Sequence, residues 1–322
     1  MFWRISLSLL IFSILAFFIS RSVDLNKLVS IISGFDKFTL GLLLLISFLI
    51  SLAKALKFYI LLLNNGLKIS FLQSLKVFIA GQATTPLPGG ESTRSFLLKK
   101  EINGKPSLTS SAILAQAYYD LLAASFIAMI LGIYFNIFEE ALTLFFIGIS
   151  FIGFLLSSHR LFSFLIKLLP TSKFLNKIEL TFKKVQKGIR DNIFNIDTKL
   201  PNKVFLYSLL IGVLINFLGG LIVFQTAQSF SINLDFLQSI FIFALSTLIT
   251  GLSITPGGLG LTEGGMLGIL FLFRINFELA LSLVLVFRFA TLIFPTALGI
   301  LTLGYFYGRD WILKERILLK NI

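Results

Sequence analysis

Two pairs of opposite charges stand at nearly equal spacing in a chain that is otherwise rich in apolar residues. Arg94 precedes Asp120 by 26 residues, and Glu263 precedes Arg288 by 25, so the order of the charges is reversed in the second pair. Asp120 and Arg288 each stand inside a long apolar run, where an unpaired charge in a bilayer would cost about 3 kcal/mol or more. The spacing therefore predicts two ion pairs, Arg94 with Asp120 and Glu263 with Arg288, at a polar site.

These residue types could bind a charged headgroup or a phosphate. A guanidinium forms paired hydrogen bonds with phosphate oxygens, and a neighbouring carboxylate can hold the arginine or contact a cationic group. Glu91 is a third acidic candidate for such a site. Two alternatives stay open at this point. The pairs could act only as clamps between helices, or Glu91, Asp120 or Glu263 could be the general base of an intramembrane transferase.

The composition argues against several other kinds of chemistry. The 322 residues include no cysteine and one histidine, so a thiolate or imidazole metal site has almost nothing to be built from. We interpret that histidine, His159, as an ordinary interfacial residue. The sequence also has no glycine-rich nucleotide loop and no nucleophile constellation. We therefore predict no metal and no cofactor, and we favour a protein that is not itself an enzyme, with the intramembrane transferase kept as the alternative.

The elements that position these charges are predicted to be membrane helices. Hydrophobic residues make up 56% of the chain, and the mean hydropathy is +0.94, more apolar surface than a soluble protein of this length can bury. We predict an all-α polytopic membrane protein, a single domain over residues 1–322, with about six transmembrane helices and two re-entrant helical hairpins. The expected spans cover about residues 3–20, 39–63, 107–134, 141–157, 204–228 and 276–305. A count of eight spans is the alternative.

The formal net charge of +13 comes from basic residues that lie between the apolar runs. Cytoplasmic loops of membrane proteins are enriched in Lys and Arg, so we expect segment 158–203 and both termini to lie in the cytoplasm. The charge favours contact with anionic lipid rather than nucleic acid. Within 158–203, apolar residues recur every three or four positions, which predicts an amphipathic helix that lies on the inner leaflet or packs on the protein.

A repeated motif relates the two charge pairs. The tetrapeptide FLQS occurs at 71–74 and again at 236–239, and each copy leads through a short apolar run to Thr-Pro and then Gly-Gly. A charged residue and a long span with one buried charge follow in both cases. By the predicted topology one copy enters from the cytoplasm and the other from outside. This order predicts an inverted-topology repeat, over about 69–135 and 234–305, as in many secondary transporters.

Proline and glycine at the two breaks predict the tips of the re-entrant hairpins. Non-helical backbone persists at membrane depth only inside protein or beside a wet cavity, and helix N-termini at such a break favour anions. The predicted tip residues are Thr85, Pro86, Gly89, Gly90, Thr255, Pro256, Gly257, Gly258 and Gly260.

The sequence resembles the lysylphosphatidylglycerol synthase transmembrane (flippase-like) family. The likeness rests on KALKFYILLLNNG (54–66), PLPGGESTRSFLLKK (86–100), AQAYYDLLAA (115–124), TPGGLGLTEGG (255–265) and VFRFATLIFPTALG (286–299). It implies a bacterial-type plasma (inner) membrane protein of the kind proposed to translocate lipids or lipid-linked sugars. The charged positions that it carries over are Lys57, Glu91, Arg94, Asp120, Glu263 and Arg288.

Two positions depart from the family pattern. Lys57 stands where Arg is commoner, and the first motif reads Gly-Gly-Glu-Ser-Thr-Arg where the family usually has Gly-Glu-hydrophobic-x-Arg. The residue pattern itself favours another role for Lys57 and Lys54, because lysines late in a span commonly extend to the headgroups.

Bifunctional relatives carry a soluble aminoacyl-transferase domain after this region, whereas the present sequence ends 17 residues beyond its last expected span. The resemblance therefore implies a stand-alone membrane domain. Lysyl transfer to phosphatidylglycerol is therefore not expected. The leading hypothesis is a translocator whose partner is an anionic phospholipid or a polyprenyl-phosphate-linked substrate. The alternatives are a non-catalytic membrane partner of a soluble lipid-modifying enzyme and an intramembrane transferase. Whether the protein forms a homo-oligomer also stays open.

Overall fold

The computed structural model describes residues 34–87, 90–102, 106–137, 142–143, 145–150, 203–253 and 255–320. All regular elements among these residues are helices. Four helical stretches are long and apolar enough to cross a membrane, which confirms the predicted all-helical membrane protein. They are α3 (Lys37–Asn64), residues Leu108–Tyr134 of α6 (Pro106–Tyr134), α10 (Lys203–Ser229), and the run Phe277–Tyr307 through α13 (Phe277–Arg288), η3 (Phe289–Ile293) and α14 (Phe294–Lys320).

These four stretches correspond to the expected spans at 39–63, 107–134, 204–228 and 276–305. The expected span at 3–20 and the amphipathic helix within 158–203 lie outside the described residues, and 141–157 is described only in part. Large apolar side chains such as Leu45, Phe217 and Leu301 remain exposed on the outer faces of the long helices. A helix that is apolar on all sides suits a lipid environment, because its outer face needs no water.

Two helical hairpins interrupt the pattern of long helices. The first consists of α4 (Phe71–Gln82), η1 (Gly90–Ser92) and α5 (Thr93–Ile102), and the second of α11 (Phe236–Leu252), η2 (Pro256–Gly258) and α12 (Leu261–Leu272). The FLQS motif begins each hairpin because its Gln is the third residue of the helix (N3) and forms a capping box with the N-cap residue. The partner of Gln73 is Ser70, and that of Gln238 is Asp235.

The hairpin tips need glycine at specific places. Gly257 and Gly258 have φ values of 61° and 70°, in the left-handed region that favours glycine. A Cβ on Gly90 would lie 1.6 Å from the carbonyl oxygen of Thr84, so no larger residue fits without moving the loop. The two tips also meet, since a Cβ on Gly257 would lie 3.3 Å from Pro86 Cα. Gly89, another predicted tip residue, lies outside the described residues.

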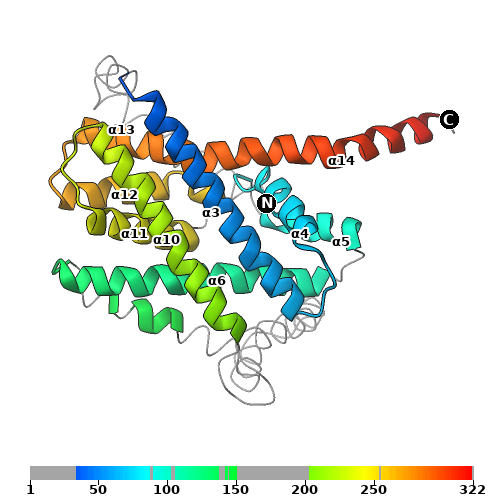
Figure 1. The fold of residues 1–322 in the computed structure, drawn as a ribbon, viewed down its shortest axis with the longest axis horizontal. Coiled ribbons are helices and arrows are strands. Elements are labelled where there is room, and N and C mark those ends of the chain that lie inside the picture. Colours follow the sequence, from blue (N-terminus) through cyan, green and yellow to red (C-terminus); the bar gives the residue numbers. More distant parts are fainter. Residues whose placement is uncertain are drawn as a thin grey trace, which may run out of the picture.

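The two hairpins lie between two long helices and approach each other from opposite ends (Figure 1). Helix α4 packs on α14, and α11 packs on α6, so each hairpin contacts the long helix that follows the other hairpin. Helices α3 and α10 pack on each other and run diagonally over one face of this layer. A long helix, a hairpin and a second long helix thus follow in the same order in both halves. This order favours the predicted repeat and places α3 and α10 ahead of its expected boundaries.

One expected span is not a regular α-helix throughout. Between α13 and α14, residues Phe289–Ile293 form a π-helix directly after Arg288. Pro295 has no N–H to donate to the carbonyl of Thr291 four residues before it, which disturbs the α-helical pattern at this point. The Ser47 hydroxyl of α3 donates to the carbonyl oxygen of Ala290 at 2.6 Å, so the widened turn is anchored to a neighbouring helix.

Candidate functional site

The second predicted ion pair is confirmed and holds the tip of the second hairpin. Arg288 Nε donates to Glu263 Oε1 at 2.5 Å, and Arg288 Nη2 donates to the carbonyl oxygen of Gly257 at 2.9 Å. The other oxygen of Glu263 accepts from the backbone N–H of Gly260 at 2.7 Å. The expected anion at this helix N-terminus is therefore the carboxylate of Glu263 itself. Arg288 joins α13 to both the backbone and the first turn of the second hairpin.

The first predicted ion pair, Arg94 with Asp120, is wrong. Arg94 Nη1 donates to Glu91 Oε2 at 3.1 Å, three residues before it in the sequence. Asp120 accepts instead from Lys57 Nζ. Helix α3 packs directly on α6 and brings the lysine to the carboxylate. The comparison of the two repeats did not predict Lys57 as the partner of Asp120, because α3 precedes the expected start of the first repeat.

Lys57 does not extend to the headgroups, as the residue pattern favoured, but is fully buried at 0% exposure. Its partner Asp120 keeps 21% of its side chain exposed, and that exposed part lines a cavity. Close approach of α10 helps to enclose the pair, since a Cβ on Gly212 would lie 3.7 Å from Lys57 Nζ. A buried pair of this kind is strongly destabilised when one partner is removed.

Arg94 is also buried, with only 5% of its surface exposed. Its guanidinium lies 4.2 Å from the centre of the Phe78 ring, within the range of a cation–π contact. Its partner Glu91 is half exposed. Arg94 Nε is buried and has no hydrogen-bond partner among the described residues, so this guanidinium keeps one unused donor.

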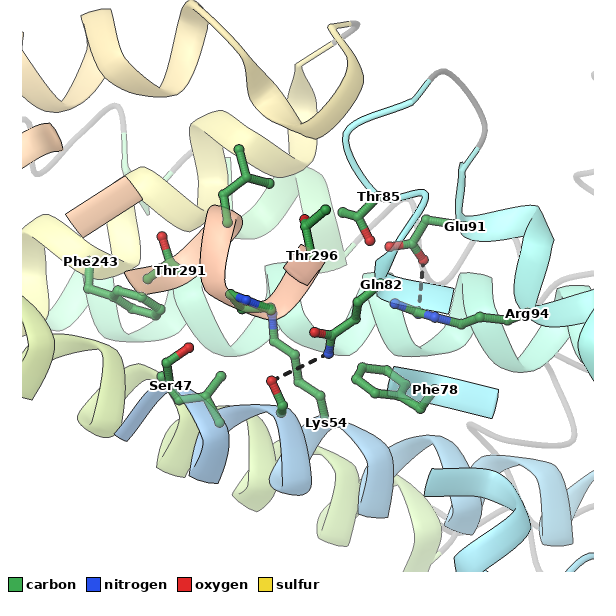
Figure 2. Close-up of a pocket in the computed structure, with 14 residues that line it drawn as sticks. Ser47, Lys54, Phe78, Gln82, Thr85, Glu91, Arg94, Phe243, Thr291 and Thr296 are labelled. Carbon is green, nitrogen blue, oxygen red and sulfur yellow. Dashed lines mark hydrogen bonds and ion pairs between the residues drawn. The ribbon is translucent and has the colours of Figure 1, made fainter. Parts of the chain in front are cut away.

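A cavity of about 130 Å³, here called the Arg94 cavity, lies against the first hairpin tip (Figure 2). Its polar and aromatic lining residues are Ser47, Ser51, Lys54, Phe78, Gln82, Thr85, Glu91, Arg94, Phe243, Thr291 and Thr296. Two of these side chains, besides Arg94, carry a buried polar atom without a partner in the described structure: Gln82 Oε1 and Thr85 Oγ1. Buried polar atoms are normally paired, so the lining suits water or a polar ligand.

A second cavity of about 250 Å³, here called the Arg288 cavity, lies beside the second hairpin. Its polar lining residues are Lys54, Asp120, Asn216, Ser246, Thr247, Thr250, Thr262, Arg288 and Thr291. Asn216 Oδ1 is buried and has no partner in the described part of the chain. Both volumes are several times the space that one water needs.

The two cavities share part of their lining. Lys54, Phe243 and Thr291 line both of them. Four of the six predicted charged residues, Glu91, Arg94, Asp120 and Arg288, line the two cavities. The other two, Lys57 and Glu263, form ion pairs with the lining residues Asp120 and Arg288. Among the described residues, no group of three or more His, Cys, Asp or Glu side chains could hold a metal ion.

Several lining residues were not predicted as site residues. Lys54 had been considered only as a residue that extends to the headgroups, although it stands three residues before Lys57 and on nearly the same helix face. Gln82 and Asn216 are polar residues within apolar helices, and such residues commonly mark polar pathways. The position of Lys54 and the polar residues Gln82 and Asn216 can be recognised in the sequence. Thr291 lines both cavities from the π-helix, which the sequence analysis did not predict.

The fold and the cavities define an integral membrane protein with a polar interior at the junction of two helical hairpins. Residues 5–299 match the family described as "Lysylphosphatidylglycerol synthase TM region". The chain belongs to this family, as the sequence resemblance predicted. UPF0104 membrane protein MJ1078 of Methanocaldococcus jannaschii is 30% identical to it over 209 residues, which cover 63% of this chain and 84% of that protein.

Proposed function

We propose that this protein translocates an amphiphile with a phosphate-bearing headgroup, a phospholipid or a polyprenyl-phosphate-linked sugar, across the inner membrane. One observation carries the proposal. Two polar cavities, each with a buried or nearly buried arginine, lie side by side within an apolar helical protein where the tips of two hairpins meet. A headgroup needs such a polar interior to cross hydrocarbon, because an unsolvated charge at the membrane centre is costly.

The outer surface supports this proposal as well. Exposed leucine and phenylalanine side chains on the long helices leave the acyl chains in contact with lipid while the headgroup enters the protein. The two arginines and their carboxylates supply charge-assisted hydrogen bonds for phosphate and for the groups attached to it. Because the hairpins approach from opposite ends, changes in their packing would open one cavity at a time to either side.

The transferase alternative gains no support from the site. Glu91, Asp120 and Glu263 each form an ion pair with a cation. A general base must present its carboxylate to the proton that it removes, and here each carboxylate already accepts from a lysine or arginine of the protein itself. The translocator remains the function that the geometry favours.

Reconstitution of the pure protein into liposomes tests the proposal. The vesicles contain a trace of headgroup-labelled phosphatidylglycerol, phosphatidylcholine or polyprenyl phosphate, and an impermeant reductant bleaches the label in the outer leaflet. We expect the protein to expose inner-leaflet label of at least one phosphate-bearing probe, above protein-free vesicles. Folded and inserted protein that moves none of the probes would contradict the proposed function.

A further inference from the structure

We propose that Lys54 is the residue that binds the phosphate of the headgroup where the two cavities join. The inference rests on the proposed translocation and narrows its substrate to a lipid whose headgroup carries net negative charge. Zwitterionic headgroups, which bring their own ammonium, are disfavoured at such a site because like charges repel in a poorly solvated interior.

The charge balance of the interior points to Lys54. Lys57, Arg94 and Arg288 each form an ion pair with one carboxylate. Lys54 has no carboxylate or other side-chain partner among the described residues, although it is partly buried within a long apolar helix. An unpaired charge at that place is costly without a polar environment or a counter-ion. A bound phosphate would supply the missing negative charge.

The position of Lys54 fits a role in both cavities. Ser47, Ile50, Ser51 and Lys54 follow one another at helical spacing and form the face of α3 that lines the Arg94 cavity. The Lys54 side chain extends from this face toward the helical segment that carries Thr291 and Thr296 (Figure 2). It also lines the Arg288 cavity. A lysine has a flexible four-carbon side chain with three donors, so the same ammonium can reach a phosphate in either cavity.

Unsatisfied donors converge on the same space. The buried Arg94 Nε and the Thr85 hydroxyl lack partners in the described structure, and both residues line the Arg94 cavity with Lys54. Phosphate oxygens accept hydrogen bonds from ammonium, guanidinium and hydroxyl groups alike. Small side-chain movements would turn the two buried donors toward a phosphate held by Lys54, so these three residues form the proposed phosphate site. From there the Lys54 ammonium would carry the phosphate past Phe243 into the Arg288 cavity.

The test compares Lys54→Gln and Lys54→Arg with the wild-type protein, and Lys68→Gln serves as the matched control because Lys68 is exposed and outside both cavities. Binding is measured by native mass spectrometry and by the melting temperature in neutral detergent after addition of phosphatidylglycerol, phosphatidylcholine or inorganic phosphate. We expect Lys54→Gln to weaken phosphatidylglycerol binding by roughly tenfold or more, because a hydrogen bond to a charged group is lost. Lys54→Arg should retain most of the binding, and Lys68→Gln all of it.

Lipid-free Lys54→Gln should melt at the same or a higher temperature than the wild type, because it removes an unpaired cation. This readout shows that the variant folds. Equal phosphatidylglycerol binding by the wild type and Lys54→Gln would overturn the inference. So would a Lys54-dependent effect of inorganic phosphate without one of phosphatidylglycerol, because the ligand would then be a free anion.

The liposome assay separates the two proposals. If the wild type moves phosphatidylglycerol and Lys54→Gln moves it at the same rate, Lys54 has no role and the translocation proposal stands. If the wild type moves no lipid but binds phosphatidylglycerol through Lys54, the binding site stands and the translocation proposal fails. Loss of both binding and movement in Lys54→Gln supports both.

Discussion

Replacement of Asp120 by Asn is expected to lower the free energy of unfolding by about 3–5 kcal/mol. Lys57 is fully buried and paired with Asp120, so the neutral amide would leave an uncompensated cation between α3, α6 and α10. The asparagine side chain has nearly the same shape as aspartate, which makes the loss of charge the main change. The measurement is the unfolding transition of the purified variant in detergent, followed by circular dichroism.

Two comparisons make this result specific to the buried pair. Glu91→Gln removes the charged partner of Arg94, but half of the Glu91 side chain is exposed. Water can replace part of the lost interaction there, so the loss of stability should be smaller than for Asp120→Asn. The double variant Lys57→Met with Asp120→Asn should recover most of the lost stability, because no unpaired charge remains. An Asp120→Asn variant as stable as the wild type would show that the pair does not hold these helices together.

Replacement of Arg288 by Lys is expected to reduce lipid movement in liposomes by roughly tenfold to a hundredfold. Arg288 uses Nε for Glu263 and Nη2 for the Gly257 carbonyl. A single ammonium cannot reproduce this planar, two-directional arrangement. The loss of one charge-assisted hydrogen bond costs about 1.5–3 kcal/mol, and each 1.4 kcal/mol corresponds to about a tenfold change in rate.

This variant keeps the positive charge beside Glu263, so the melting temperature should fall only moderately. Arg274→Lys is the matched control, since Arg274 lies in the turn between α12 and α13 and lines neither cavity. It should transport at the wild-type rate. Transport by Arg288→Lys at the wild-type rate would mean that the pair only clamps the hairpin and takes no part in the movement of the headgroup.

The long helices and the hairpins were predictable because their signals are local. Apolar runs of sufficient length defined the four described spans, and the FLQS motif marked two capping boxes at the start of two hairpins. Glycine and proline marked the tips, where Gly257 and Gly258 adopt left-handed conformations. These features depend on a few adjacent residues and therefore appear in the sequence directly.

The partners of the charged residues were only partly predictable. Glu263 and Arg288 follow each other within one half of the chain, and their pairing was predicted correctly. Asp120 pairs with Lys57 on a helix that precedes the expected repeat, so the choice of partner depended on how α3 packs on α6. Packing between distant helices determines such contacts, and a single sequence contains no local signal for it.

The residues that line the two cavities could not be predicted from the sequence in detail. Residues from both hairpins, α3, α10 and the π-helix line them together, and the two volumes meet at Lys54. Pro295 was the one local sign of the π-helix, because its missing N–H breaks the pattern of α-helical hydrogen bonds. The position of a single proline does not tell which side chains the widened turn brings together.

We infer that the two cavities form one hydrated path for a headgroup. The chain has no native cysteine, so single cysteines at Thr85 in the Arg94 cavity and at Thr247 in the Arg288 cavity can be tested in vesicles with a charged, membrane-impermeant thiol reagent. A cysteine at Ala244, which is fully buried in α11, is the control. We predict that both cavity cysteines react and that the Ala244 cysteine does not. Cavity cysteines as inert as the control would show a dry interior, which would contradict a hydrated path through the two cavities.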